Sequence, residues 1–419
     1  MKSLFSLLLV VLVTATSAKP NLPVKPYKQI LLYRATGPTR TYRLRYGPDK
    51  PVFTNGWTDE TYQIKMDAGS PSQSFKMTVD FGWGPTFLFG DSVSTPQTQS
   101  VPRCARTLKQ MNFYDAGVSN AFNPLVQGRN TYYTYDFKSP YVPECAKERQ
   151  ITGQIVSDDF QIDDQKFKQV PFVLTDRLIS TKILHAGWPA DGIFGLGNWD
   201  GMFEDGKTSF VKRILETYGD AGVNVAQKLI TVYLGNTLRS QYSPLDEPAA
   251  WLTIGGIDKE HCDGNGWHYV KPARHGIWAV NVDGFTMGNY QPAGSAAIGL
   301  LTSPTAFIYA PGQIRDGIAR KLGAEYDVQL DLDFVDCNRR GQMPTMQFDL
   351  QGYKYKVKPE YYARQLNGVN GPNPRKQCVL MVGSSNNQTW YLGTTFNRPK
   401  CVLFDYAQKR LAFADSLMH

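Results

Sequence analysis

Tyr62-Gln63-Ile64 opens a pattern that continues through Gly69-Ser70-Pro71 to Thr78-Val79-Asp80-Phe81-Gly82. Apolar residues take every second position on both sides of the glycine; they are Ile64, Met66 and Ala68, then Phe75, Met77 and Val79. Such alternation predicts half-buried β-strands, and Gly-Ser-Pro between two strands predicts a turn. The pattern therefore predicts a β-hairpin that leads into a loop at Asp80.

Similar alternation, punctuated by glycine and proline, recurs in both halves of the 419-residue chain and predicts a mostly β fold. A chain of this length exceeds what one hydrophobic core supports, so we expect two lobes. Two segments have helical spacing instead, Ser209 to Tyr218 and Pro311 to Leu322. Their apolar faces contain Val211, Ile214 and Leu215, and Ile314, Ile318 and Leu322.

The two halves of the chain repeat one plan weakly. Asp80 is followed by Ile193-Phe194-Gly195, and Gly299 is followed by Tyr391-Leu392-Gly393. This repetition predicts duplicated lobes with a cleft between them. The chain becomes polar and rich in turn residues between Gly235 and Pro248, which predicts a boundary there. We therefore expect an N-terminal β lobe over residues 61–235 and a C-terminal β lobe over residues 236–419.

Further motifs follow in a fixed order. They are Asp191-Gly192-Ile193-Phe194-Gly195-Leu196-Gly197, Leu252-Thr253-Ile254-Gly255-Gly256-Ile257-Asp258, Trp278, Trp390-Tyr391-Leu392-Gly393 and Val402-Leu403-Phe404-Asp405. Together with the stretch from Tyr62 to Phe89, they resemble the pepsin-like aspartic proteases over nearly all of the chain beyond residue 60. The resemblance implies a bilobal fold of two pseudo-symmetric β lobes.

That family's reaction needs two carboxylates that share one proton, because neighbouring like charges cannot both ionise. One carboxylate activates a water and the other donates to the developing oxyanion. The resemblance places Asp80 at the first position and Gly299 at the second. A glycine supplies neither acid nor base, so we expect a catalytically inactive homologue that acts by binding a peptide or protein near the cleft. The alternative is an active aspartic-type endopeptidase that works at acidic pH through a non-standard site.

Other residues around the expected site also depart from the family pattern. The threonine that follows each catalytic aspartate is replaced by Phe81 and Leu300, which implies that both hydroxyls beneath the site are lost. Phe137 takes the place of the flap tyrosine and is followed by Lys138-Ser139-Pro140, and strand pairing is expected to resume at Ile151. The residues expected at the cleft are Phe81, Trp83, Phe137, Leu300 and Thr302.

The N-terminus predicts export. Residues 1–18 combine Lys2, an apolar run too short to span a bilayer, and a small-residue cleavage site, so we expect a secreted protein or one of a lysosome-like compartment.

Residues 19–60 follow as a basic segment. Residues 19–50 hold eight basic residues and one acid, while residues 51–419 hold 36 of each sign. We expect a prosegment or a retained strand; an anionic surface is the rival partner, and no nucleic-acid partner is expected.

Six cysteines allow fifteen pairings, and the residues alone do not choose among them. The resemblance implies a bridge between Cys337 and Cys378, which leaves Cys104 with Cys145 and Cys262 with Cys401 if bridges stay within lobes.

Asn387-Gln388-Thr389 is a glycosylation sequon. No cofactor is expected, and no metal either, because His261, Cys262, His268 and His275 match no zinc-ligand spacing.

Overall fold

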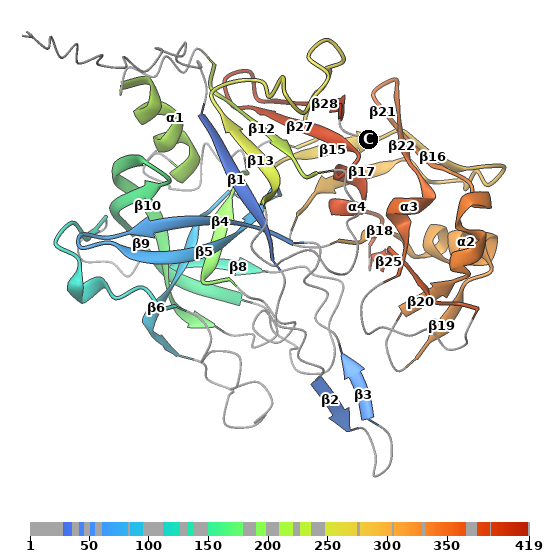
Figure 1. Ribbon diagram of the computed structural model, residues 1–419, viewed down its shortest axis with the longest axis horizontal. Coiled ribbons are helices and arrows are strands. Elements are labelled where there is room, and N and C mark those ends of the chain that lie inside the picture. Colours follow the sequence, from blue (N-terminus) through green and yellow to red (C-terminus); the bar gives the residue numbers. More distant parts are fainter. Residues whose placement is uncertain are drawn as a thin grey trace, which may run out of the picture.

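The computed structural model describes most of the chain beyond residue 60 and three short strands before it. The described residues are 28–35, 42–45, 51–54, 61–82, 84–94, 112–125, 132–136, 150–178, 190–197, 209–220, 227–235, 248–274, 277–303, 306–328, 332–365, 375–385 and 387–417. Figure 1 shows β-structure on two sides of the molecule, with further strands between them. The predicted mostly β, bilobal architecture is confirmed.

The described residues of the first half of the chain lie mostly in strands. They are β1 (Lys28–Ala35), β2 (Tyr42–Arg45), β3 (Pro51–Thr54), β4 (Thr61–Ala68), β5 (Gln73–Asp80), β6 (Phe87–Ser94), β7 (Asn123–Pro124), β8 (Tyr132–Asp136), β9 (Gln150–Ile162), β10 (Gln165–Leu178), β11 (Gly192–Gly195) and β12 (Leu229–Tyr233). Helix α1 (Phe210–Asp220) and the 3-10 helix η3 (Ala116–Val118) complete this half.

The second half adds shorter strands and most of the helices. The strands are β13 (Pro248–Ile254), β14 (His268–Val270), β15 (Ala279–Val282), β16 (Gly284–Met287), β17 (Ala297–Leu301), β18 (Ile308–Pro311), β19 (Glu325–Asp327), β20 (Leu332–Val335), β21 (Met346–Leu350), β22 (Tyr353–Val357), β23 (Ala363–Arg364), β24 (Cys378–Leu380), β25 (Val382–Ser385), β26 (Trp390–Leu392), β27 (Lys400–Asp405) and β28 (Arg410–Asp415). The helices are α2 (Gly312–Leu322), α3 (Pro359–Tyr362), α4 (Thr394–Asn397) and the 3-10 helix η5 (Cys337–Gln342).

The predicted hairpin is formed by β4 and β5, which pair antiparallel from Gln63 opposite Thr78 to Ala68 opposite Gln73. Its apolar positions face a core, and all six of them are buried. Gly69 has a φ of 92° in the connecting turn, a conformation that a residue without a Cβ adopts at little cost. The hairpin delivers Asp80 to the last position of β5.

One 14-stranded sheet connects the two halves of the chain. Its main path runs β14-β28-β27-β12-β13-β1-β4-β5-β11-β6-β10-β9-β7, with β8 paired to β9. The N-terminal basic segment contributes β1, which pairs antiparallel with β13 on one side and β4 on the other. Ile30 of this strand is only 4% exposed. Residues 28–35 of the basic segment thus form a strand of the shared sheet, and Figure 1 shows β1 at its centre.

Each half contains the repeated unit that the sequence indicated. In the first, β11 pairs parallel with β5; in the second, β26 pairs parallel with β17. Both predicted helices are present as α1 and α2, and Val211, Ile214, Leu215, Ile314 and Ile318 are buried. The expected lobe boundary falls on residues 236–247, which lie outside the described residues.

Two expected disulfides are confirmed, Cys262–Cys401 and Cys337–Cys378. Cys104 and Cys145 lie outside the described residues. Asn387 is exposed between β25 and β26, where its side-chain oxygen accepts the Thr389 backbone N–H at 2.9 Å. The described part of the chain has no helix that is both long and apolar enough to cross a membrane.

Tyr62, on β4, connects three distant parts of the chain through its buried hydroxyl. The hydroxyl donates to the Leu234 carbonyl at 2.7 Å and accepts from the Arg398 guanidinium at 3.0 and 3.2 Å. Tyr62 is fully buried and Arg398 is only 2% exposed. A buried guanidinium needs such acceptors because its desolvation is costly.

We predict that Tyr62→Phe lowers the free energy of unfolding by about 2 kcal/mol, because a buried carbonyl and a buried guanidinium each lose a partner. Denaturant unfolding of the purified protein measures the change. Tyr269→Phe is the matched control, since Tyr269 is 39% exposed and Arg410 stacks on its ring, which the variant keeps. Equal stability of the two variants would contradict the assignment.

Candidate active site

Asp80 is held at the end of β5 by backbone contacts. Its carbonyl accepts the Leu196 N–H at 2.8 Å, and its Oδ1 accepts the Gly82 N–H at 2.9 Å. Gly195 of β11 lies directly opposite Asp80 in the parallel register. The loop that follows β5 therefore turns back onto the carboxylate and fixes its orientation.

The Asp80 carboxyl lies in a poorly solvated environment, since the residue is only 4% exposed. Burial raises the pKa of Asp80 from its ordinary value of 3.8 to about 7, because the charged form loses hydration. The hydrogen bond from Gly82 favours the charged form and opposes part of this increase. A carboxyl of this kind is mostly protonated in mildly acidic solution.

Ser303 joins the loop after β17 to the loop at Asp80. Its hydroxyl accepts the Phe81 backbone N–H at 3.1 Å and donates to the Val79 carbonyl at 2.6 Å. Ser303 is fully buried. One hydroxyl thus satisfies a donor and an acceptor on either side of Asp80, from a position more than 220 residues further along the chain. The expectation that both bracing hydroxyls are lost is wrong.

The strand register also corrects the expected second catalytic position. In the first half, Asp80 lies opposite the glycine of Ile193-Phe194-Gly195. In the second half, Leu301 lies opposite Leu392, and the Thr302 N–H donates to the Leu392 carbonyl at 3.2 Å. Thr302 therefore lies against Gly393, the glycine of Tyr391-Leu392-Gly393. The residue equivalent to Asp80 is Thr302 rather than Gly299.

Gly299 lies three residues earlier, within β17, between Val280 of β15 and Trp390 of β26. A Cβ on this glycine would lie 2.9 Å from Val282 Cγ2 and 3.1 Å from Leu392 Cδ1. These distances are shorter than ordinary packing contacts, so the position is a close approach of strands. The glycine thus has a packing role in the sheet.

Thr302 is half-buried, and its backbone is tied to α4. The side-chain amide of Asn397 donates to the carbonyls of Thr302 and Leu392 at 3.3 and 2.8 Å. A threonine hydroxyl can donate and accept one hydrogen bond, but it does not supply a carboxylate. At the two equivalent positions, the chain therefore has one buried carboxyl, on Asp80, and one threonine hydroxyl, on the half-buried Thr302.

The structure describes two of the four remaining residues that were predicted to lie at the cleft. Phe81 is fully buried and packs edge-on against Phe404, with ring centroids 5.3 Å apart, so its side chain belongs to the core rather than to a cleft surface. Leu300 is half-buried on β17. Trp83 and Phe137 lie outside the described residues. Strands β8 and β9, where the flap was expected, pair from Tyr132 opposite Gln154 to Asp136 opposite Gln150, so pairing begins one residue before the expected Ile151.

Asp191 ties the segment before β11 to β5. Its carboxylate accepts the backbone N–H groups of Lys76 and Asn112 at 2.8 and 2.7 Å. Burial raises the pKa of Asp191, and these hydrogen bonds oppose the increase. The carboxylate thereby fixes the start of β11 next to β5.

The histidines near Cys262 have structural contacts. The His261 ring bonds to the Asp258 carboxylate at 2.8 Å and stacks on Tyr233, while His268 stacks on Tyr353. Cys262 belongs to a disulfide. Within the described ranges, no group of three or more histidine, cysteine or acidic residues is arranged to hold a metal ion.

Comparison with known proteins shows to which family the chain belongs. The model of the eukaryotic aspartyl protease family matches residues 61–416. The chain belongs to this family. It is 23% identical to gastricsin of Cavia porcellus over 364 residues, which cover 85% of this chain and 81% of that protein. It is 22% identical to pepsin A of Bos taurus over 363 residues, or 85% of each chain. A match to aspartic protease 17 of Caenorhabditis elegans is 25% identical over 232 residues, 54% of this chain and 55% of that protein.

We predict that Ser303→Ala destabilises this aspartyl protease homologue by about 2 kcal/mol, because the Phe81 N–H and the Val79 carbonyl lose their shared partner in a buried site. Ser303→Thr keeps the hydroxyl and should recover most of the loss. Thermal and denaturant unfolding measure both variants. If alanine were tolerated as well as threonine, the hydroxyl would not be a brace.

A second prediction concerns pH. The folded state holds the Asp80 proton up to about pH 7 and the unfolded state only to about pH 4, so this group's contribution is fully present below pH 4 and is lost as pH rises through 7. Asp80→Asn removes the titration. The stability of the variant relative to wild type should therefore rise between about pH 4 and pH 8, by on the order of 4 kcal/mol.

Unfolding experiments at several pH values test this pH dependence. Asp91→Asn removes an exposed carboxylate from β6, a strand of the same sheet, and is the control. A stability difference between Asp80→Asn and wild type that stays constant over this pH range would show that Asp80 titrates as an ordinary surface carboxyl.

Proposed function

We propose that this aspartyl protease homologue binds an extended peptide or protein segment near Asp80 and Thr302 without hydrolysing it. The main support is the strand register next to Thr302, from which we infer that a threonine stands at the second half's equivalent of Asp80. Hydrolysis by this family's chemistry requires a base for the water and an acid for the oxyanion at the same moment. Asp80 can be one of these but not both.

The ionisation of Asp80 agrees with this proposal. Its raised pKa is caused by burial, with the Gly82 hydrogen bond acting in the opposite direction. A catalytic pair of carboxylates shifts its pKa values by sharing a proton between two like charges, which is a different cause. A buried, protonated carboxyl and a threonine hydroxyl are both neutral hydrogen-bonding groups, which suits recognition of a peptide backbone.

Hydrogen bonds fix the backbone around Asp80 and Thr302. Ser303 and Asn397 hold the loops at Asp80 and Thr302 through hydrogen bonds, and Asp191 ties the start of β11 to β5. A binding site benefits from such preorganisation because less conformational entropy is lost on association.

We also propose that the protein resides in an oxidising compartment and is glycosylated at Asn387, since the chain holds two disulfides and exposes Asn387 within a sequon.

An assay on denatured globin at acidic pH tests for hydrolysis. We predict no cleavage by the wild-type protein, and cleavage by Thr302→Asp that a statine-type transition-state inhibitor blocks. Gly299→Asp is the matched control: it adds a carboxylate three residues earlier, within β17, but its side chain enters the tight contact with Val282 and Leu392, so it should remain inactive and be less stable. Inhibitor-sensitive cleavage by the wild type would overturn the proposal and favour an active endopeptidase.

A binding experiment tests the other half of the proposal. Labelled denatured globin should bind the wild-type protein, as measured by fluorescence anisotropy, and Thr302→Arg should weaken binding about tenfold or more by placing a bulky cation at the site. Thr286→Arg, on β16, should leave binding unchanged. Equal binding by wild type and Thr302→Arg would place the ligand elsewhere.

A further inference from the structure

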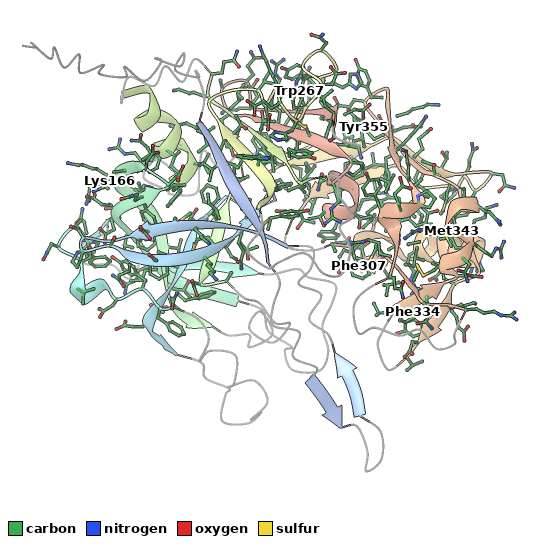
Figure 2. All side chains as sticks on the ribbon, in the orientation of Figure 1. Lys166, Trp267, Phe307, Phe334, Met343 and Tyr355 are labelled. Carbon is green, nitrogen blue, oxygen red and sulfur yellow. A yellow bond between two sulfur atoms is a disulfide. The ribbon has the colours of Figure 1, made fainter. Side chains whose placement is uncertain are left out.

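A second potential site lies in the C-terminal half, on elements that do not include Asp80 or Thr302. It is a groove of about 940 Å³ between the end of α2, the 3-10 helix η5 and the residues before β24. We call it the basic groove; the residues used in the argument are Lys321, Arg339, Arg375, Lys376, Asp336 and Met343. Figure 2 labels Met343, which lies beside α2.

The charge of the basic groove is strongly one-sided. Four cationic side chains line it, with one carboxylate, Asp336. That carboxylate accepts the Asn338 backbone N–H at 2.9 Å and so caps the first turn of η5. Residues 51–419 hold equal numbers of acidic and basic side chains. A local excess of three positive charges in a neutral part of the chain therefore points to an anionic ligand.

The lysines of the groove have fixed positions. Lys376 Nζ donates to the Gly323 carbonyl at 2.8 Å and lies 3.4 Å from the Glu325 carboxylate, and Lys321 Nζ donates to Asn289 Oδ1. Arg339 and Arg375 are exposed. The two arginines, with planar donors suited to carboxylates, are the residues best placed to contact a ligand.

A covalent bond holds the two arginines on facing segments. Cys337, at the start of η5, is bridged to Cys378, at the start of β24. Arg339 follows the first cysteine by two residues, and Arg375 precedes the second by three. The disulfide restrains both segments before any ligand arrives, which lowers the entropic cost of binding between them.

The uncharged part of the lining indicates the chemical class of the ligand. It includes Leu322, Met343 and Pro344, and no aromatic side chain occurs among the described lining residues. Sugar rings usually stack on aromatic rings, whereas a flexible thioether beside aliphatic groups suits apolar peptide side chains. The volume is within the range of sites that enclose a short segment of ligand.

We propose that the basic groove binds an acidic peptide segment, with its carboxylates on Arg339 and Arg375 and an apolar side chain against Met343. The site is separate from the one under Proposed function, and neither depends on the other. The occupant is a segment of another polypeptide in which acidic residues flank a leucine-like residue.

A direct test uses fluorescein-labelled peptides and the intact protein. The probe repeats Glu-Glu-Leu, and the two comparison peptides repeat Gln-Gln-Leu and Glu-Glu-Ser. We expect the first to bind in fluorescence anisotropy at low salt, with about tenfold weaker binding or more for each comparison peptide, and with affinity that falls as salt rises. Equal binding of the serine peptide, or stronger binding of a sulfated polysaccharide that displaces the probe, would overturn the acidic-peptide assignment.

Variants locate the site. Combined Arg339→Glu and Arg375→Glu should weaken probe binding about tenfold or more, and Arg339→Gln alone by a smaller factor. Arg340→Glu is the matched control, because Arg340 is exposed on the same 3-10 helix but does not line the groove. Thr302→Arg should leave probe binding unchanged. If Arg340→Glu weakened binding as much as the double variant, the effect would be general electrostatics and the groove would not be the site.

Discussion

The hydroxyl of Ser303 is the contact on which the geometry of the candidate active site depends. It accepts from Phe81 and donates to Val79, so it fixes the backbone on both sides of Asp80 from the opposite half of the chain. Buried backbone groups that lose such a partner are costly, and this cost fixes the distance between the two loops. The loop at Asp80 is braced by this hydroxyl although phenylalanine and serine stand where two threonines were expected.

Much of the fold could be read from the sequence because its signals are local. The alternation around Gly69 predicted β4 and β5, and the spacing of Val211, Ile214 and Leu215 predicted α1. The second catalytic position was harder, since no aspartate marks it. Ala297-Ile298-Gly299 resembles the end of the strand that precedes the family's loop. This resemblance placed the second catalytic position at Gly299, three residues before Thr302. Thr302-Ser303 carried the missing signal, because Ser303 preserves the bracing hydroxyl.

Charge illustrates a second limit of sequence reasoning. Counting along the chain places the net positive charge in residues 19–50 and leaves the remainder neutral. The fold then gathers Lys321, Arg339, Arg375 and Lys376, from three separate segments, around one groove. A sum over the sequence could not show this concentration, because it arises from the disulfide and from the end of α2 rather than from neighbouring positions.

Strand β1 has a consequence for maturation of the chain. It is flanked by β4 and β13, so departure of residues 28–35 would leave two rows of backbone donors and acceptors without partners in the middle of a continuous sheet. Open strand edges attract other extended chains, which risks self-association. Any proteolytic trimming of this protein must therefore cut upstream of Lys28, or another segment must slide into the vacated position.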